Sequence, residues 1–143
     1  MTVVCGHDEA ISQWVAERIP HVGEAGFGPC AALAVVGRDK VLAGVVYHDY
    51  QPDHGTIQLS MAADSPMWAK RSNIKALLSY PFEQLGVFKV WTATPIDNTR
   101  AIVVNEHIGL KREATLAHHF GHKRHAVICR MLRPEYTRLY GDS

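Results

Sequence analysis

The histidine in the segment VVYHDY (residues 45–50) is the side chain best suited to acid–base chemistry. The ordinary pKa of an imidazole lies near neutrality, so its surroundings decide whether it takes up or releases a proton. His48 lies near the end of a β-rich segment, and Asp49 beside it would either orient the ring or begin the following turn. We therefore consider His48 a candidate general base, against the alternative of a strand-end histidine that faces water.

Four more histidines lie close together in AHHFGHKRH (residues 117–125), and they raise the question of a metal site. His118 and His122 would share one face of a helix, at the i, i+4 spacing that zinc sites use. However, Gly121 interrupts such a helix, no acidic third ligand is near, and the composition is that of a loop. We expect no structural metal here, so a metal-binding module is the weakest functional alternative.

The segment MAADSPMWAKRSNIKALL (residues 61–78) has the layout of a strand, a loop and a helix that together could hold a phosphate. Ser65 suits the N-cap and Pro66 the first helical position, where free N–H groups can face an anion. The segment contains no glycine, although glycine is the residue that lets a main chain approach a phosphate closely. Lys70 and Arg71 are candidates to compensate as charged donors. The alternative is a capped surface helix whose basic side chains lie in water.

The composition narrows the classes of protein. The chain has 143 residues, 47% of them hydrophobic and 20% charged, with a net charge of +1, which suits one domain spanning residues 1–143. This balance argues against a nucleic-acid partner and against a disordered chain. No stretch approaches 18 apolar residues and no secretory leader is recognisable, which argues against a membrane partner. Three scattered cysteines favour a reducing, cytoplasmic compartment.

Hydrophobic periodicity and turn residues predict the elements that position these side chains. Residues 8–19 should form an amphipathic helix with Asp8 as its cap, and a second helix should begin at Ser65, kink at Pro81 and end at Gly86. Strands are predicted at residues 31–37, 40–50, 56–63, 87–93, 110–116 and 125–132, and a third helix at 99–108 with Asp97 or Asn98 as its cap and Gly109 at its end.

The order of these elements predicts a mixed sheet. The strands at residues 31–37, 40–50 and 56–63 should run antiparallel to one another because short turns join them. The strand at residues 87–93 can lie parallel to the strand before it, since a whole helix separates the two. The result is an α/β sheet with helices on both faces.

The residues from Asn98 onward carry a recognisable pattern. An asparagine is followed by a small residue, a helix, a glycine with an apolar residue, and a glutamate before a final hairpin; these are Asn98, Ala101, Gly109, Leu110 and Glu113. The pattern resembles the C-terminal half of GNAT-superfamily N-acetyltransferases, with Leu110 in place of the usual phenylalanine. AHHFG (117–121) is similar to the ribosomal-protein and Nα-acetylating branch, and WAKR with YPFEQLG looks like a small phage- or prophage-encoded subset. The resemblance covers about residues 8–134.

The resemblance implies a GNAT-like α/β (α+β) fold: a mixed, mostly antiparallel sheet with a central splayed parallel strand pair and helices on both faces. Residues 2–6 would be a truncated first strand and residues 56–63 the fourth. Acetyl-CoA would be the cofactor, with its pantetheine arm between the splayed strands and its pyrophosphate at the glycine-free loop. The residues expected to bind the cofactor are Met61, Ala62, Ala63, Trp68, Ala69, Lys70, Arg71, Asn98 and Asn105, of which Lys70 and Arg71 would compensate for the missing glycines.

The same resemblance implies transfer of the acetyl group to a primary amine by direct attack in a ternary complex. A main-chain N–H of Met61 or Ala62 would polarise the thioester carbonyl, and His48 would be the base. Asn105 stands where many relatives have a tyrosine, and an amide can hydrogen-bond the sulfur or pantetheine but cannot supply a proton. Glu113 matches a family position and completes the catalytic candidates.

The partners stay less defined than the chemistry. The acceptor would be a small-molecule amine, a peptide N-terminus or a lysine, and the loop at residues 117–125 would line its entrance. The resemblance also implies a homodimer as the assembly to test. A rival hypothesis is a catalytically inactive GNAT-fold binding or regulatory protein, which the glycine-free loop and Asn105 favour.

Overall fold

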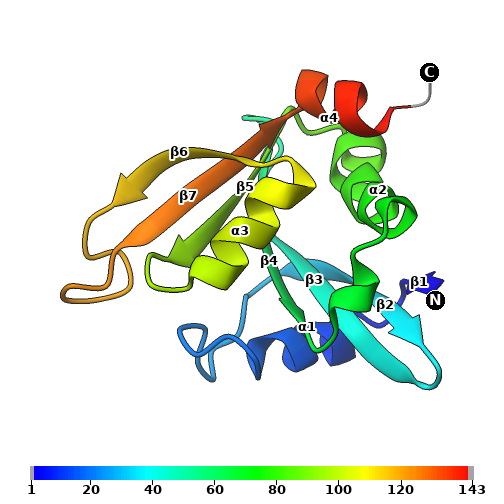
Figure 1. The fold of residues 1–143 in the computed structure, drawn as a ribbon, viewed down its shortest axis with the longest axis horizontal. Coiled ribbons are helices and arrows are strands. Elements are labelled where there is room, and N and C mark those ends of the chain that lie inside the picture. Colours follow the sequence, from blue (N-terminus) through cyan, green and yellow to red (C-terminus); the bar gives the residue numbers. More distant parts are fainter. Residues whose placement is uncertain (1, 142–143) are drawn as a thin grey trace.

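The computed structural model describes residues 2–141, and within them a seven-stranded sheet has the order β1-β2-β3-β4-β5-β7-β6 (Figure 1). Neighbouring strands are antiparallel except β4 and β5, which are parallel. This is the mixed, mostly antiparallel sheet that the sequence predicts. The strands are β1 (Thr2–Val4), β2 (Cys30–Gly37), β3 (Lys40–Gln51), β4 (Thr56–Ala63), β5 (Lys89–Pro95), β6 (Lys111–Leu116) and β7 (Ala126–Leu132).

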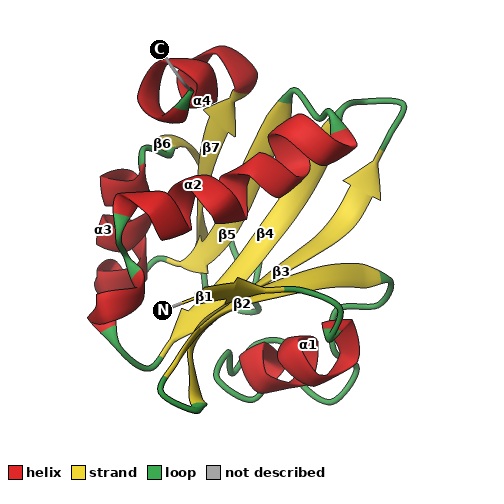
Figure 2. Cartoon of the chain, turned by 90° about the vertical axis from the view of Figure 1, so that its right-hand side faces the viewer, coloured by secondary structure: helices red, strands yellow, loops and turns green. Residues whose placement is uncertain are grey.

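Helices cover both faces of the sheet, as predicted. They are α1 (Asp8–Ala16), α2 (Arg71–Ser79), α3 (Thr99–Ile108) and α4 (Arg133–Tyr140). The helix α1 packs with one set of β2 and β3 side chains, whereas α2, α3 and α4 join a larger core on the other face, so α1 and α2 lie on different sides of the sheet (Figure 2). Within residues 2–141, no helix combines the length and the apolar character needed to cross a bilayer.

Local sequence signals predict several boundaries correctly. β4 has the predicted bounds, and α3 begins after Asn98, whose side chain accepts the Ala101 N–H at 3.2 Å. Gly109 ends α3 in the left-handed region, with φ of 118°, which glycine adopts without strain. The strand predicted at residues 87–93 begins two residues later, because the Val87 N–H still bonds to a carbonyl of the preceding helical turn.

The first helix is shorter than predicted. It ends at Ala16 rather than at residue 19, since the N–H groups of Arg18 and Ile19 bond to carbonyls three residues back and Pro20 cannot continue the helix. The prediction of Asp8 as its cap is also wrong. His7 occupies the cap position, and the Asp8 carboxylate instead accepts the Ala32 N–H of β2 at 2.9 Å, which fastens the helix to the sheet.

The second helix differs more from its predicted form than the first. Ser65 does cap a helical turn and accepts the Met67 N–H at 3.2 Å, but this is a short 3₁₀ turn, Pro66–Trp68, and α2 begins only at Arg71. The chain leaves helical geometry because Trp68 is buried beneath the turn. Its carbonyl accepts the side-chain amide of Asn73 at 3.0 Å, so no continuous helix forms.

The end of the second helix follows the prediction in outline. Pro81 changes the hydrogen-bonding pattern, and the last turn, Tyr80–Leu85, is a π-helix. Gly86 then closes it with φ of 74°. Ile74, Leu77 and Leu78 of α2 are buried.

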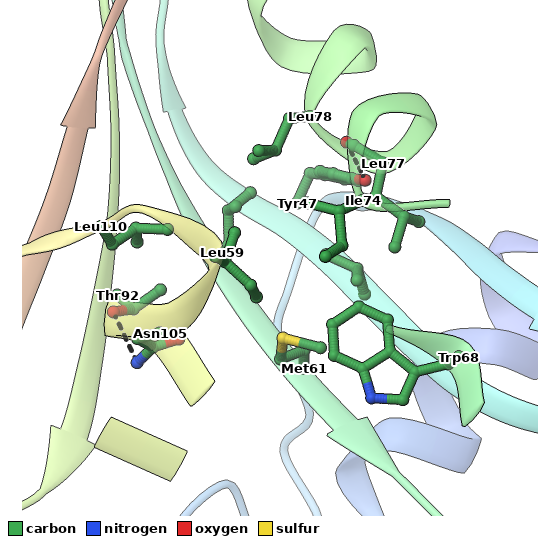
Figure 3. A pocket seen from close by; sticks show the side chains of 12 residues that line it. Tyr47, Leu59, Met61, Trp68, Ile74, Leu77, Leu78, Thr92, Asn105 and Leu110 are labelled. Atoms are coloured by element: carbon green, nitrogen blue, oxygen red, sulfur yellow. Dashed lines mark hydrogen bonds between the residues drawn. The ribbon is translucent and has the colours of Figure 1, made fainter. Parts of the chain in front are cut away.

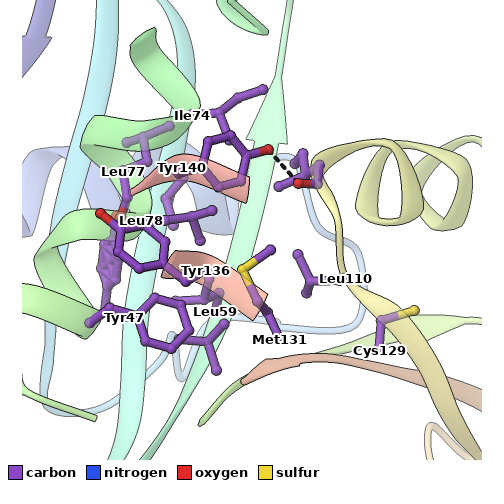
Figure 4. Packing of buried hydrophobic residues seen from close by; sticks show 14 of the residues in the cluster. Tyr47, Leu59, Ile74, Leu77, Leu78, Leu110, Cys129, Met131, Tyr136 and Tyr140 are labelled. Atoms are coloured by element: carbon purple, nitrogen blue, oxygen red, sulfur yellow. Dashed lines mark hydrogen bonds between the residues drawn. The ribbon is translucent and has the colours of Figure 1, made fainter. Parts of the chain in front are cut away.

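Sequence reasoning missed α4, which follows the last strand. The Glu135 carboxylate accepts the Leu132 N–H at 2.9 Å and so satisfies a free donor at its start. Tyr136 and Tyr140 of α4 are buried in the large core beside Met131 (Figure 4). The Tyr140 hydroxyl donates to the Ile108 carbonyl, which ties α4 to the end of α3.

Candidate functional site

The parallel strands β4 and β5 separate partway along their length. They pair only from Thr56–Lys89 to Gln58–Trp91, although β4 continues to Ala63 and β5 to Pro95. The main-chain groups that point across this gap therefore have no strand partner. The gap opens into a cleft of about 610 Å³, which α3, the loop after β4 and residues 18–21 complete.

Most residues predicted to bind the cofactor line this cleft. They are Met61, Ala62, Ala63, Trp68, Ala69, Asn98 and Asn105. The strand residues do so because the β4–β5 ladder ends at Gln58. Asn98 does so because the cap of α3 lies next to the end of β5.

Lys70 and Arg71 do not line the cleft. Lys70 is exposed at the N-cap of α2. The Arg71 guanidinium donates to the Leu139 carbonyl at 2.8 Å and lies over the Tyr140 ring at 5.5 Å. Arg71 therefore fastens α4, which is a structural role that the sequence did not predict.

Other cationic or titratable side chains line the cleft instead, among them Arg18, Arg100 and His107. Sequence reasoning missed them, although Arg100 and His107 stand seven residues apart on α3, which puts them on one helical face. The Arg100 guanidinium brings positive charge to the cleft, and such a group can bind a phosphate.

Arg18 also fixes the loop that follows β4. Its guanidinium forms two bonds with Asp64, of 2.9 and 3.0 Å, and lies 3.6 Å from the centre of the Trp14 ring. The hydrogen bond to Asp64 raises the pKa of Arg18, and the same bond lowers the pKa of Asp64. The pair connects the turn after α1 to Asp64, the first residue after β4, so both walls of the cleft are held at this point.

The glycine-free loop is held by side chains. Ser65 accepts a main-chain N–H, Trp68 is buried, and Asn73 donates from within the first turn of α2 to the Trp68 carbonyl. No side chain caps the N-terminus of α2. Its first N–H groups are therefore free of intrahelical bonds and side-chain caps, as an anion site requires.

Asn105 lies deep in the cleft. It is buried, and its side-chain amide donates to the hydroxyls of Thr92 and Thr94 on β5, at 3.2 and 3.3 Å. Figure 3 shows Asn105 and Thr92 on one side of a hollow, opposite Trp68 and α2. This places an amide group close to where β4 and β5 separate.

His48 and Ser60 form a polar pair. The Nε2 atom of His48 lies 2.8 Å from the Ser60 hydroxyl, and the Phe27 ring packs 5.0 Å from the imidazole, centre to centre. Ser60 lines the cleft, whereas His48 stands behind it on the face of the sheet that α1 covers. Burial lowers the pKa of His48, which Asp49 partly offsets, so the ring is neutral at pH 7. Sequence reasoning missed Ser60, which stands two residues after the position paired with His48.

Glu113 stands apart from these groups. On β6, its carboxylate accepts from Lys89 at 3.0 and 3.2 Å and lies 3.6 Å from Arg130, and it does not line the cleft. The structure therefore does not bring Glu113 together with His48 and Asn105.

The histidine-rich loop is organised by its own backbone. The Nδ1 atom of His118 accepts the Lys123 N–H at 2.7 Å, and the Nδ1 atom of His125 accepts the His118 N–H at 2.9 Å. No cluster of three or more metal-ligating side chains occurs in the part of the chain that the structure describes.

This loop also reaches the mouth of the cleft. Its Phe120 stacks on His21 at 4.1 Å between ring centres, and His21 lines the cleft. Burial lowers the pKa of His21, and the charges of Arg124 and His119 lower it further. The mouth is thus formed by aromatic and basic groups.

Comparisons with known proteins address the fold. No protein-family model matches the chain, and no curated protein sequence matches it. Solved structures do: mutant forms of the spermidine/spermine N-acetyltransferase SpeG from Vibrio cholerae superimpose with a TM-score of 0.74 at 13% identity, over 96% of this chain and 97% of that one. A dodecameric structure of the Vibrio cholerae spermidine N-acetyltransferase superimposes with a TM-score of 0.73 at 14% identity, over 94% of this chain and 95% of that one. A candidate acetyltransferase from T. thermophilus gives 0.66 at 21% identity, over 79% and 64%.

These similarities assign the fold. At such low identity the similarities show the architecture and do not identify a substrate. The chain has the GNAT acetyltransferase fold, with β4 and β5 as its splayed pair and α2 after the loop that follows β4.

Proposed function

We propose that the protein is an N-acetyltransferase that moves the acetyl group of acetyl-CoA to a primary amine. The observation that carries the proposal is the cleft between the separated ends of β4 and β5. It exposes a row of unpaired main-chain groups between two rigid strands, and a pantetheine arm with its two amides can pair with such groups.

The residues around the cleft fit the parts of the cofactor. The β4 segment 61–63 offers main-chain groups to the arm, and Trp68 and Ala69 offer apolar contact. The first N–H groups of α2 and the guanidinium of Arg100 offer positive charge to the phosphates. Lys70, at the N-cap of α2, can extend toward the same phosphates.

The bound cofactor supplies a thioester that an amine can attack. The amine must attack in its neutral form, and it would lose a proton as the carbon–sulfur bond breaks and the thiolate of CoA is released. The Ser60 hydroxyl, which lines the cleft, would accept this proton while it donates its own proton to Nε2 of His48, which lies 2.8 Å away and belongs to a neutral ring. Asn105 donates hydrogen bonds at the deep end of the cleft, and no general acid is assigned to it.

The acceptor is proposed to be a small-molecule or peptide amine with few positive charges. Among the described residues lining the cleft, Asp64 is the acidic one, and Arg18 already neutralises it. A polyamine such as the neighbours' spermidine carries several charges and would meet Arg100 and the basic mouth near His21. We also propose a homodimer and a cytoplasmic location.

Calorimetry tests the cofactor assignment. Arg100→Gln should weaken CoA binding about tenfold, because it removes a charge-assisted hydrogen bond. Arg38→Gln, in the turn between β2 and β3, removes an equal charge outside the cleft and should leave binding unchanged. Thiol release with a panel of amines then tests turnover. Absence of CoA binding at millimolar ligand would overturn the proposal, and binding without thiol release would favour an inactive GNAT-fold protein.

A further inference from the structure

A small apolar bay opens from the deep end of the cleft (Figure 3). Its walls are formed by Tyr47 of β3 and by Ile74, Leu77 and Leu78 of α2. Its rim is shared with the cleft and includes Leu59 and Asn105. The bay therefore lies between the sheet and α2, behind the point where β4 and β5 separate.

The size of the bay is about 30 Å³. A single water-sized sphere needs roughly 10–15 Å³ of such space, so the bay has room for about two heavy atoms. Its walls are apolar, since the Tyr47 hydroxyl is already bonded to the Leu77 carbonyl at 2.6 Å. Such a cavity holds carbon better than water, because water would find few hydrogen-bond partners in it.

The position of the bay connects it to the reacting end of a ligand in the cleft. The bay's rim is formed by Leu59 and Thr92, the first residues beyond the last β4–β5 pair. Arg100 and Ala69, the latter two residues before α2, line the cleft but not the bay. A linear ligand whose phosphates bind beside these two residues can place its other end at the bay, and in an acyl-CoA that other end is the thioester.

We propose that this bay is an acyl pocket and that the protein accepts donors one or two carbons longer than acetyl-CoA, namely propionyl- or butyryl-CoA. The inference rests on the proposed function, since it assigns the donor of the same reaction. The extra carbons occupy the space between Leu59 and Leu77, while Asn105 and Thr92 contact the polar end of the acyl group at the rim.

A binding series tests the pocket without turnover. CoA, acetyl-, propionyl-, butyryl- and hexanoyl-CoA are titrated calorimetrically into the protein in the absence of an amine. Affinity should rise about fourfold for each methylene that the bay buries and should fall at hexanoyl-CoA, whose chain exceeds the space. A flat series, or one that weakens from acetyl-CoA onward while CoA still binds, would refute the acyl pocket and leave the proposed function standing. Absence of any CoA binding would overturn both.

Variants of one wall residue make the test specific. Ile74→Val enlarges the bay by one methyl group and should move the optimum toward the longer chain, whereas Ile74→Phe should fill the bay and remove the preference while CoA itself still binds. Ile102→Val makes the same small change in the same core outside the bay and should keep the wild-type optimum. If all three variants show one chain-length profile, the bay is a packing gap and the inference is wrong.

Discussion

The Tyr47 hydroxyl compensates for a proline inside a helix. In a regular helix, the Leu77 carbonyl would accept the N–H of residue 81, but that residue is Pro81 and has no N–H. The carbonyl is buried with its residue, and the Tyr47 hydroxyl donates to it at 2.6 Å from β3. Tyr47→Phe should therefore leave a buried carbonyl without its donor.

The stability lost in Tyr47→Phe follows from the burial of both the Tyr47 hydroxyl and the Leu77 carbonyl. An orphaned buried acceptor destabilises a protein by about 1–3 kcal/mol. For a chain of 143 residues, this corresponds to a loss of roughly 3–9 °C in Tm. Urea unfolding should show a lower midpoint with an unchanged m-value, and exposed Tyr50→Phe should shift the free energy of unfolding by less than about 0.5 kcal/mol.

A double-mutant cycle identifies the cause. Pro81→Ala restores an N–H at residue 81, which can bond to the Leu77 carbonyl. In that background Tyr47→Phe should cost about 1 kcal/mol less than in the wild type. If the two costs are equal, the tyrosine does not compensate for the proline, and the reasoning fails.

Three further outcomes are expected. Activity should fall toward acid pH with a midpoint below about 6.5, because burial lowers the pKa of His48. His48→Gln should remove this decline at acid pH and reduce kcat about 10²-fold. An unchanged dependence of kcat on pH in this variant would exclude proton transfer through Ser60 and His48. Gly109→Ala should lower Tm more than Gly121→Ala. Both glycines have φ of 118°, but a Cβ at Gly109 would lie 2.6 Å from Leu139 Cδ1, whereas a Cβ at Gly121 would meet no atom within 4 Å. Equal losses of Tm would leave backbone strain as the sole cause. Burial raises the pKa of Tyr47, so the contribution of its neutral hydroxyl to stability is complete below about pH 10 and is lost as the pH rises further. The urea midpoint of Tyr47→Phe should therefore fall less steeply between about pH 9 and 11 than the midpoint of the wild type.

The sequence predicts elements well where the signal is local. β2, β3 and β4 are runs of β-branched and apolar residues between turn residues, and α3 has an asparagine cap and a left-handed glycine. The parallel pairing of β4 and β5 follows from the helix between them. The strands and caps depend on a few adjacent residues and the pairing on the order of the elements, which is why no knowledge of the tertiary structure is needed.

The predictions that fail are those that depend on tertiary contacts. The capping signal at Ser65 is read correctly, but the burial of Trp68 decides that the turn ends after three residues. Arg71 is assigned to a phosphate from its place in the loop, whereas the unpredicted α4 brings the Leu139 carbonyl within its reach. Ser60 is overlooked because its importance comes from His48 on the neighbouring strand, a relation that exists only once the register is known.

The glycine-free loop, which we propose faces the phosphates of the cofactor, keeps its shape through residues other than glycine. Glycine contributes conformational freedom and close access to the main chain, and it contributes no donor of its own beyond the backbone N–H. Here Trp68 and Asn73 set the bend through burial and a side-chain bond, and the Arg18–Asp64 pair fixes the start of the loop. The N-terminus of α2 is left uncapped by side chains, so the N–H donors remain available although no glycine precedes them. The absence of the glycine pattern is therefore compatible with phosphate binding, and the cost falls on how closely a ligand can approach the loop.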